Sequence, residues 1–97
     1  MNTPLEIAID HPLRRRAVRL LVEKGSLATP LVAERLGLHL AETAYHLQVL
    51  SGVDVLSVEL GEKREYVYAE NLDECPPWVR EAIEASDGLE GTERFGK

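Results

Sequence analysis

Disulfide-forming cysteines, aromatic residues and long apolar runs are all scarce in this sequence. It contains a single cysteine, Cys75, and 5% aromatic residues in a chain of 97 residues. One thiol forms no internal disulfide, which fits a protein of a reducing compartment. No apolar run approaches the roughly 20 residues that cross a bilayer, and no basic region followed by an apolar stretch marks a signal peptide. We therefore expect a cytoplasmic protein that does not engage a membrane.

Motifs of catalysis and of metal binding are lacking as well. The sequence holds no glycine-rich phosphate loop and no nucleophile motif. His39 and His46 are seven positions apart, about 10.5 Å along a helix, which is too far for them to share one metal ion. We therefore predict that the protein is not an enzyme and that it has no metal site and no cofactor.

Positive charge is also in short supply, which bears on binding to nucleic acid. The formal net charge is −6, from 11 Lys and Arg against 17 Asp and Glu. Most of the excess acid lies at the C-terminal end, where residues 69–97 hold three Lys or Arg against eight Asp or Glu. Residues 11–68 hold eight against seven. Because non-specific attraction to phosphates scales with the number of Lys and Arg contacts, this near-neutral region predicts that the attraction is weak.

What the sequence does contain is a series of short amphipathic helices. Residues 3–6 (TPLE) have the form of a capping box, and Asp10 is placed to cap the helix that follows. Apolar residues recur at helical spacing, and Gly25, Gly37 and Gly52 follow the segments that they end. The predicted helices cover residues 4–9, 11–24, 30–36, 40–51 and 78–85.

The apolar period changes from helical to two after the fourth helix. Residues 55–60 alternate Leu56, Val58 and Leu60 with polar residues, and residues 65–69 form a return strand after a polar turn. This pattern predicts a β-hairpin. We therefore expect a mainly α fold with a small β-hairpin, in one domain of residues 1–85. Residues 86–97 are charged, contain glycine and lack periodicity, which predicts a disordered acidic tail.

A tight turn at residues 37–39 joins the third and fourth predicted helices. Two short helices joined by a glycine turn and followed by a two-stranded ribbon suit an α+β winged helix-turn-helix. The second helix of such a pair can enter the major groove of DNA. Its inner face is predicted to be Leu40, Thr43, Leu47 and Leu50.

Three segments resemble the ArsR-type winged helix-turn-helix regulators, namely residues 11–21 (HPLRRRAVRLL), 32–38 (VAERLGL) and 45–50 (YHLQVL). The resemblance extends from residue 4 to residue 85. It implies a transcriptional repressor that binds a palindromic operator as a homodimer. The chain departs from the family by lacking a Cys-x-Cys metal motif and by having Thr43 at an aliphatic position. It also has no Ser or Thr at the start of the fourth helix, which begins Leu40, Ala41, Glu42.

The outer face of helix 40–51 is the candidate surface for contact with bases. Gln pairs with adenine, Glu accepts from cytosine N4, Ala contacts the thymine methyl group, and Tyr donates to a phosphate. A histidine at the turn and two cations at the hairpin tip are placed to meet phosphates. The predicted contacts with double-stranded DNA are His39, Ala41, Glu42, Tyr45, His46, Gln48, Lys63 and Arg64. An ordinary solvated position is the alternative for these residues, and a half-buried structural position is the alternative for His46.

The densest basic cluster is Arg14, Arg15, Arg16 and Arg19. Consecutive helical residues point about 100° apart, so these four side chains cannot all face one ligand. We expect a mostly solvated face, on which one or two arginines reach phosphate and the others pair with nearby acids.

Apolar residues near the two ends of the chain are candidates for a dimer interface. Large aromatic residues are enriched at interface cores, and the family resemblance favours a homodimer. The predicted interface residues are Leu5, Trp78, Val79, Ala82 and Ile83, with packing inside their own domain as the alternative. The acidic net charge and Glu42 support a second hypothesis, a winged-helix protein-interaction module that does not bind DNA. No set of residues indicates a small-molecule effector.

Overall fold

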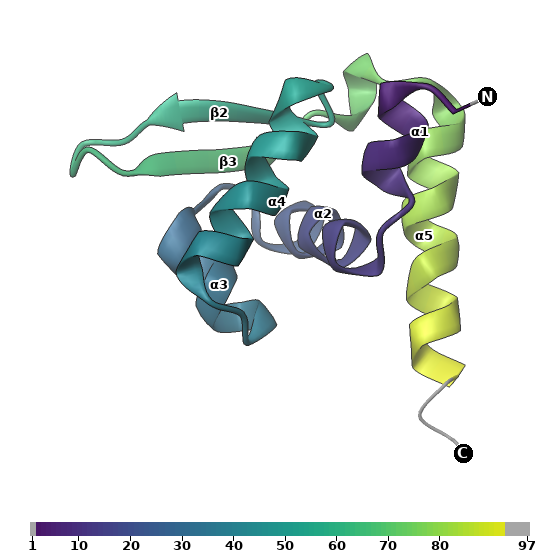
Figure 1. Cartoon of the computed structure of the whole chain (residues 1–97), viewed down its shortest axis with the longest axis horizontal. Coiled ribbons are helices and arrows are strands. Elements are labelled where there is room, and N and C mark those ends of the chain that lie inside the picture. Colours follow the sequence, from purple (N-terminus) through teal and green to yellow (C-terminus); the bar gives the residue numbers. More distant parts are fainter. Residues whose placement is uncertain (1, 93–97) are drawn as a thin grey trace.

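The computed structural model describes residues 2–92 of the chain, with side chains placed for residues 2–85. Its elements in chain order are α1 (Pro4–Ile9), α2 (Pro12–Lys24), β1 (Leu27–Ala28), α3 (Thr29–Leu36), α4 (Leu40–Gly52), β2 (Leu56–Leu60), β3 (Tyr66–Glu70), a 3-10 turn (Leu72–Glu74) and α5 (Pro77–Thr92). Helices dominate, and one small antiparallel sheet extends to one side of them (Figure 1). The predicted class, mainly α with a small β-hairpin, is confirmed.

The capping box predicted at the start of α1 is present. Thr3 Oγ1 accepts a hydrogen bond from the Glu6 N–H at 3.1 Å, and Glu6 Oε1 accepts one from the Thr3 N–H at 2.8 Å. These two bonds satisfy donors that the first turn of a helix leaves unpaired, and they define the start of a helix only six residues long.

The cap predicted for α2 is wrong by one residue. His11 is the N-cap in place of Asp10, and its Nδ1 accepts a hydrogen bond from the Leu13 N–H at 3.2 Å. The cause is Pro12, because a proline holds the residue before it in the extended conformation that an N-cap adopts. Asp10 instead lies 3.9 Å from the Arg15 guanidinium.

Helix α2 lies at the centre of the fold and packs against α1, α3, α4, α5 and β3. Aliphatic side chains supply most of the core around it, as the shortage of aromatic residues requires. The core residues are Ile9, Ala17, Val18, Leu21, Val32, Leu47, Leu50, Val55, Leu56, Tyr68, Leu72, Val79 and Ile83. Burial of α4 against this core fixes which of its faces turns to solvent.

The inner face predicted for α4 is correct except at Leu40. Thr43, Leu47 and Leu50 are buried, whereas Leu40 is exposed. Leu40 is the first residue of α4, at the end that joins α3 and lies away from α2 (Figure 1). Helical spacing puts it on the inner side, but the core does not reach this end of the helix.

Strands β2 and β3 form the predicted hairpin, with Val58 opposite Tyr68 and Leu60 opposite Tyr66. The short strand β1 pairs with the other side of β3, giving the order β1-β3-β2. The sequence did not predict β1, because a strand of two residues shows no period. Leu56 is buried, whereas Val58 and Leu60 are exposed, since the hairpin extends beyond the helices (Figure 1).

Helix α5 continues to Thr92, past the end at Ala85 that the apolar period predicted. Residues 86–92, which were expected to begin the disordered tail, are part of this helix. Residues 93–97 lie outside the described residues, so the division into a domain and a tail stays a prediction. Over residues 2–92, no helix is both long and apolar enough to cross a membrane.

Candidate nucleic-acid interface

The turn between α3 and α4 has the geometry of a glycine-terminated helix end. Gly37 adopts the left-handed conformation, with φ 70° and ψ 36°, which glycine reaches without a Cβ clash. The Leu38 N–H donates to the Ala33 carbonyl at 3.0 Å, and the Gly37 N–H donates to the Glu34 carbonyl at 3.3 Å. The predicted turn is confirmed, and it directs the chain from α3 into α4.

The solvent side of α4 carries the four residues of this helix that were predicted to face DNA, three for contact with bases and Tyr45 for contact with a phosphate. Ala41, Glu42, Tyr45 and Gln48 are all exposed, and Tyr45 keeps 57% of its surface accessible. We call these four residues the recognition face. The opposite side of α4 is buried, so the helix presents this face as a fixed surface. Contact of the face with DNA stays a prediction.

Thr43 shows how α4 accommodates a polar residue at a core position. Its side chain is buried, and its Oγ1 donates to the His39 carbonyl at 2.9 Å within the same helix. The hydroxyl is therefore satisfied without a partner from another element. The His39 side chain is exposed and does not cap the helix, so its predicted position at the surface of the turn is correct.

His46 is buried, which contradicts its prediction as a DNA contact. It is 6% exposed, and its Nδ1 accepts a hydrogen bond from Arg14 Nε at 3.1 Å, on the side that faces α2. Helical spacing places His46 at the edge of the apolar face, and the packing of α2 puts it inside. The structural role, given as the alternative, is the one that the structure supports.

The surroundings of His46 favour its neutral form. Burial lowers the pKa of His46, and the charges of His11 and Arg14 act in the same direction. Glu42 opposes them, with its carboxylate 3.9 Å from His46 Nε2. The His11 ring lies 4.6 Å from the His46 ring, centroid to centroid. A neutral ring leaves Nδ1 free to accept from Arg14.

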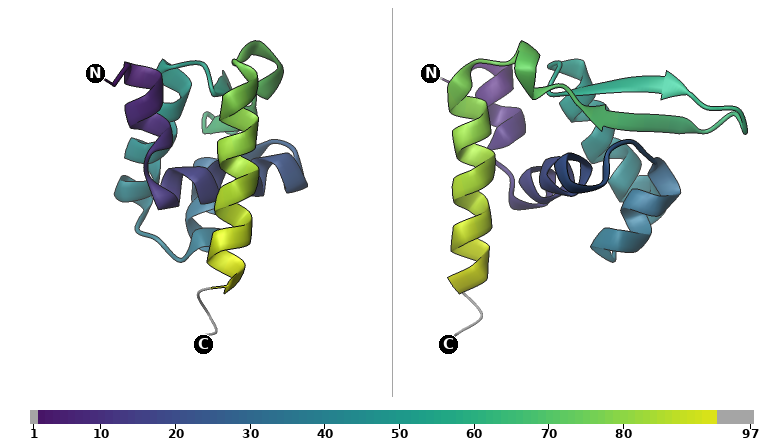
Figure 2. Two further views of the ribbon diagram at one scale, coloured as in Figure 1. Left: turned by 90° about the vertical axis from the view of Figure 1, so that its right-hand side faces the viewer. Right: turned by 180° about the vertical axis from the view of Figure 1, so that it is seen from behind.

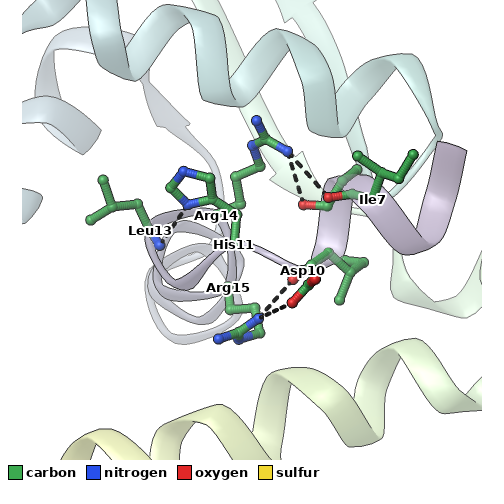
Figure 3. Close-up of polar contacts among 8 residues, drawn as sticks. Ile7, Asp10, His11, Leu13, Arg14 and Arg15 are labelled. Carbon is green, nitrogen blue, oxygen red and sulfur yellow. Dashed lines mark hydrogen bonds and ion pairs between the residues drawn. The ribbon is translucent and has the colours of Figure 1, made fainter. Parts of the chain in front are cut away.

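The sequence predicted a mostly solvated face for the arginine cluster of α2, and the structure corrects this prediction at Arg14. Arg14 is buried, with 8% of its surface exposed, and NH1 of its guanidinium donates to the carbonyls of Ile7 and Ala8 at 3.4 Å each (Figure 3). Arg15 donates to the Ile9 carbonyl at 3.0 Å. Both arginines therefore bind the last turn of α1. Arg16 is exposed and Arg19 is half-buried.

The tip of the hairpin presents the two predicted cations. Lys63 and Arg64 are exposed, and a bond of 2.7 Å from the Gly61 N–H to the Glu65 carbonyl closes the turn. Arg64 has φ 64°, in the left-handed region that favours glycine. Glu62 and Glu65 flank the two cations, so the tip is mixed in charge.

Two of the predicted interface residues are unavailable to a partner. Val79 and Ile83 are 0% and 2% exposed, because α5 uses them to cover α2, and this corrects their prediction as dimer contacts. Trp78 is 39% exposed, while Leu5 and Ala82 are half-buried.

Helices α1 and α5, which carry the predicted interface residues, lie beside each other at the end of the molecule opposite the wing (Figure 2). The sequence did not single out Ile7, which is exposed on α1. A helix of six residues is too short to show by its period which apolar residue faces outward.

Among the described side chains, no group of three or more His, Cys, Asp or Glu residues is arranged to hold a metal ion.

Comparison with known proteins identifies solved structures that share this arrangement of helices and strands. No family model and no curated protein sequence matches the chain. A solved structure of Mb0332 from Mycobacterium bovis is similar, with a TM-score of 0.68 and 18% identity over 92% of this chain and 77% of that one. It is a homodimeric winged helix-turn-helix DNA-binding domain, described as a possible ArsR-family transcriptional regulator.

This chain has a winged helix-turn-helix fold.

Two further solved structures are similar. YusO from Bacillus subtilis has a TM-score of 0.71 and 15% identity, over 95% of this chain and 65% of that one. RV1404 from Mycobacterium tuberculosis has a TM-score of 0.60 and 16% identity, over 90% and 64%. The chain thus spans about two thirds of the length of these two proteins. In this winged helix-turn-helix, α3 and α4 are the helix pair, with α4 as its second helix, and β2 and β3 form the wing. The resemblance seen in the sequence is confirmed at the level of the fold.

Proposed function

We propose that this chain binds double-stranded DNA as a homodimer and acts as a transcriptional repressor in the cytoplasm. The observation that carries the proposal is the recognition face, four exposed side chains on a helix whose opposite side is buried. A major groove about 12 Å wide admits a helix in this position. The family resemblance of the sequence supports repression as the outcome of binding.

The recognition face has the chemistry to distinguish base pairs. Gln48 offers an amide that can bind adenine through two hydrogen bonds, and Glu42 can accept from cytosine N4. Ala41 is small enough to meet a thymine methyl group, and Tyr45 can donate to a phosphate. His39, Lys63 and Arg64 are exposed at the turn and the wing tip, where phosphate contacts would fix the orientation of the duplex.

We infer that a second copy binds at the end formed by α1 and α5. Ile7 of α1 and Trp78 of α5 are exposed, and Leu5 of α1 and Ala82 of α5 are half-buried. The similar domain of Mb0332 is homodimeric, which supports this arrangement. Two-fold symmetry would place the two recognition helices about 34 Å apart, one turn of DNA, and would require a palindromic site.

Selection of binding sites from random duplex DNA by the purified chain tests the proposal. We expect a palindrome with half-sites about 10 base pairs apart and an affinity that falls with salt. Gln48→Ala should relax the preference at one base pair of each half-site, whereas Lys63→Ala should lower affinity for every sequence. A promoter that overlaps the selected site should be silenced by the chain in a reporter strain. No enrichment at low salt, with the chain folded, would overturn the proposal.

A protein-interaction module is the second candidate, and specific observations favour it. The net charge is −6, and Val58, Leu60 and Tyr66 are exposed on the wing, where apolar groups gain nothing from phosphates. In this case the chain would co-purify with a protein partner and without nucleic acid. Leu60→Ser on the wing would release that partner, whereas it would leave selection of a DNA palindrome intact.

A further inference from the structure

A buried arginine connects the recognition helix to two other helices. The Arg14 side chain starts on α2, its NH1 donates to the Ile7 and Ala8 carbonyls of α1, and its Nε donates to His46 Nδ1 of α4 at 3.1 Å. The guanidinium carbon also lies 5.8 Å from the centre of the Tyr45 ring. One side chain thus binds α1, α4 and a member of the recognition face.

The partners of Arg14 match the chemistry of a guanidinium. The carbonyls of Ile7 and Ala8 belong to the last turn of α1, where a helix leaves acceptors unpaired and carries partial negative charge. Neutral His46 supplies an acceptor in a fixed direction. A buried charge is tolerated only when its donors are satisfied, so these contacts restrict Arg14 to one position.

The contact with Tyr45 extends this restriction to the surface. Tyr45 is 57% exposed, and an exposed aromatic side chain otherwise samples several rotamers. A guanidinium within about 6 Å of a ring attracts it electrostatically. The His46 ring lies 5.5 Å from the Tyr45 ring, centroid to centroid, and borders it as well. Arg14 and His46 therefore fix the orientation in which Tyr45 meets a ligand.

We propose that Arg14 is a positioning residue for DNA recognition, which acts through His46 and Tyr45 and does not touch DNA itself. This inference rests on the proposed function. It predicts that loss of the Arg14–His46 bond weakens discrimination between sequences. Non-specific binding is set by the exposed cations and should stay constant.

The test uses substitutions that separate the effect of the Arg14–His46 hydrogen bond from the effects of the Arg14 charge and of the His46 ring. Arg14→Lys keeps the charge and removes the Nε donor, and Arg16→Lys makes the same exchange at an exposed position of α2. His46→Leu removes the acceptor, whereas His46→Asn keeps an acceptor close to the place of Nδ1. Thermal unfolding followed by circular dichroism establishes that each variant is folded at the temperature of the assay.

The first readout is the ratio of affinities for the selected DNA site and a scrambled duplex. Arg14→Lys and His46→Leu should each lower this ratio about tenfold, because a hydrogen bond that involves a charged group is lost. His46→Asn, which keeps the acceptor but not the ring, should lower it less than His46→Leu does, and Arg16→Lys should leave it unchanged. The double variant with Arg14→Lys and His46→Leu should lose no more than either single variant, since both remove the same bond. Equal loss of specific and non-specific affinity would indicate a merely structural role and overturn the inference.

The second readout needs no DNA. In amide NMR spectra of the free chain, Arg14→Lys and His46→Leu should shift the resonances of Tyr45 and its neighbours in α4 in the same direction. Arg16→Lys should not shift them. Unshifted α4 resonances in Arg14→Lys would overturn the inference about Arg14. Failure of the wild-type chain to bind any duplex would overturn the proposed function, so the two failures are distinguishable.

Discussion

At the scale of single residues, the polar groups in the core are each matched to a specific partner. Among the described side chains, Arg14, Thr43 and His46 are the buried polar or charged ones. Thr43 is satisfied within its own helix, while Arg14 and His46 bind each other across two helices. The bond between Arg14 and His46 requires a neutral imidazole, because a protonated ring has no acceptor.

Stability should therefore fall in acid through His46. Burial lowers the pKa of His46 below the ordinary value of 6.5, the charges of His11 and Arg14 lower it further, and Glu42 opposes them. Tyr45 also faces the ring. As pH falls from 6.5 toward the lower pKa of the folded chain, the unfolded chain binds a proton at His46 more readily than the folded chain does, so unfolding becomes more favourable. The contribution is fully present above about pH 6.5 and is lost below it.

His46→Asn tests this expectation, because asparagine keeps an acceptor for Arg14 and does not titrate. Melting temperatures are compared at about pH 7.5 and about pH 5.5. The wild-type chain should lose more stability than the variant between these two values. Equal losses would show that other groups cause the acid sensitivity.

At the scale of elements, the turn between α3 and α4 depends on the backbone of one glycine. A Cβ built on Gly37 meets no atom within 4 Å, so any cost of a side chain there comes from its positive φ. Gly52, at the end of α4, also has open space around a built Cβ, and its φ is not positive. The two positions form a matched pair.

Gly37→Ala should destabilise the protein by about 1–2 kcal/mol, the cost of the left-handed conformation for a residue with a Cβ. Gly52→Ala should be neutral or stabilising by about 0.5 kcal/mol, because alanine is the better helix former. Urea unfolding of both variants gives the two free energies. A loss at Gly52 as large as the loss at Gly37 would contradict the backbone explanation.

A substitution at the tip of the wing is expected to raise the stability of the protein and to lower its affinity for DNA. Arg64 occupies a left-handed conformation at the hairpin tip and is proposed to contact phosphate. Arg64→Gly should raise stability by up to about 1 kcal/mol and lower affinity for every DNA sequence. Lys63→Ala should lower affinity without the gain in stability. Thermal unfolding and a binding assay on the same samples separate the two effects, and an unchanged affinity in both variants would remove the wing from the interface.

Most elements of this fold could be predicted from the sequence, because helical and alternating apolar periods were clear. The recognition face was also predictable, since Ala41, Tyr45 and Gln48 lie opposite the buried stripe of α4. The sequence could not show that His46 is inside or that Val79 is covered, because both depend on the position of α2 beside them. A period identifies the faces of a helix, but it does not identify which neighbouring element covers each edge.

At the scale of the whole molecule, two places carry exposed large apolar residues on neighbouring elements, besides the scattered Val22, Leu31, Leu40 and Tyr45. One is the end formed by α1 and α5, with Ile7 and Trp78, and the other is the wing, with Val58, Leu60 and Tyr66; these two parts of the fold lie apart in Figure 1. The first is proposed to bind a second copy, because Trp78 and Ile7 could bury there together.

Trp78→Ala should weaken this dimer, since truncation of an aromatic anchor at the centre of an interface costs about 2 kcal/mol or more. Sedimentation equilibrium should show a dimer for the wild-type chain and a shift toward monomer for the variant. Leu60→Ser, on the wing, is the matched surface control and should leave the dimer intact. A variant Trp78→Ala that remains fully dimeric would place the interface elsewhere.

The position of β2 at the edge of the sheet has a consequence for the handling of the protein. Within residues 2–92, no strand pairs with its outer backbone donors and acceptors, and the segment Leu56–Leu60 contains one charged residue, Glu59, but no lysine or proline. Such strands are templates for pairing with other chains. In concentrated samples this edge would promote aggregation, and a bound duplex that covers the wing would keep the protein dispersed.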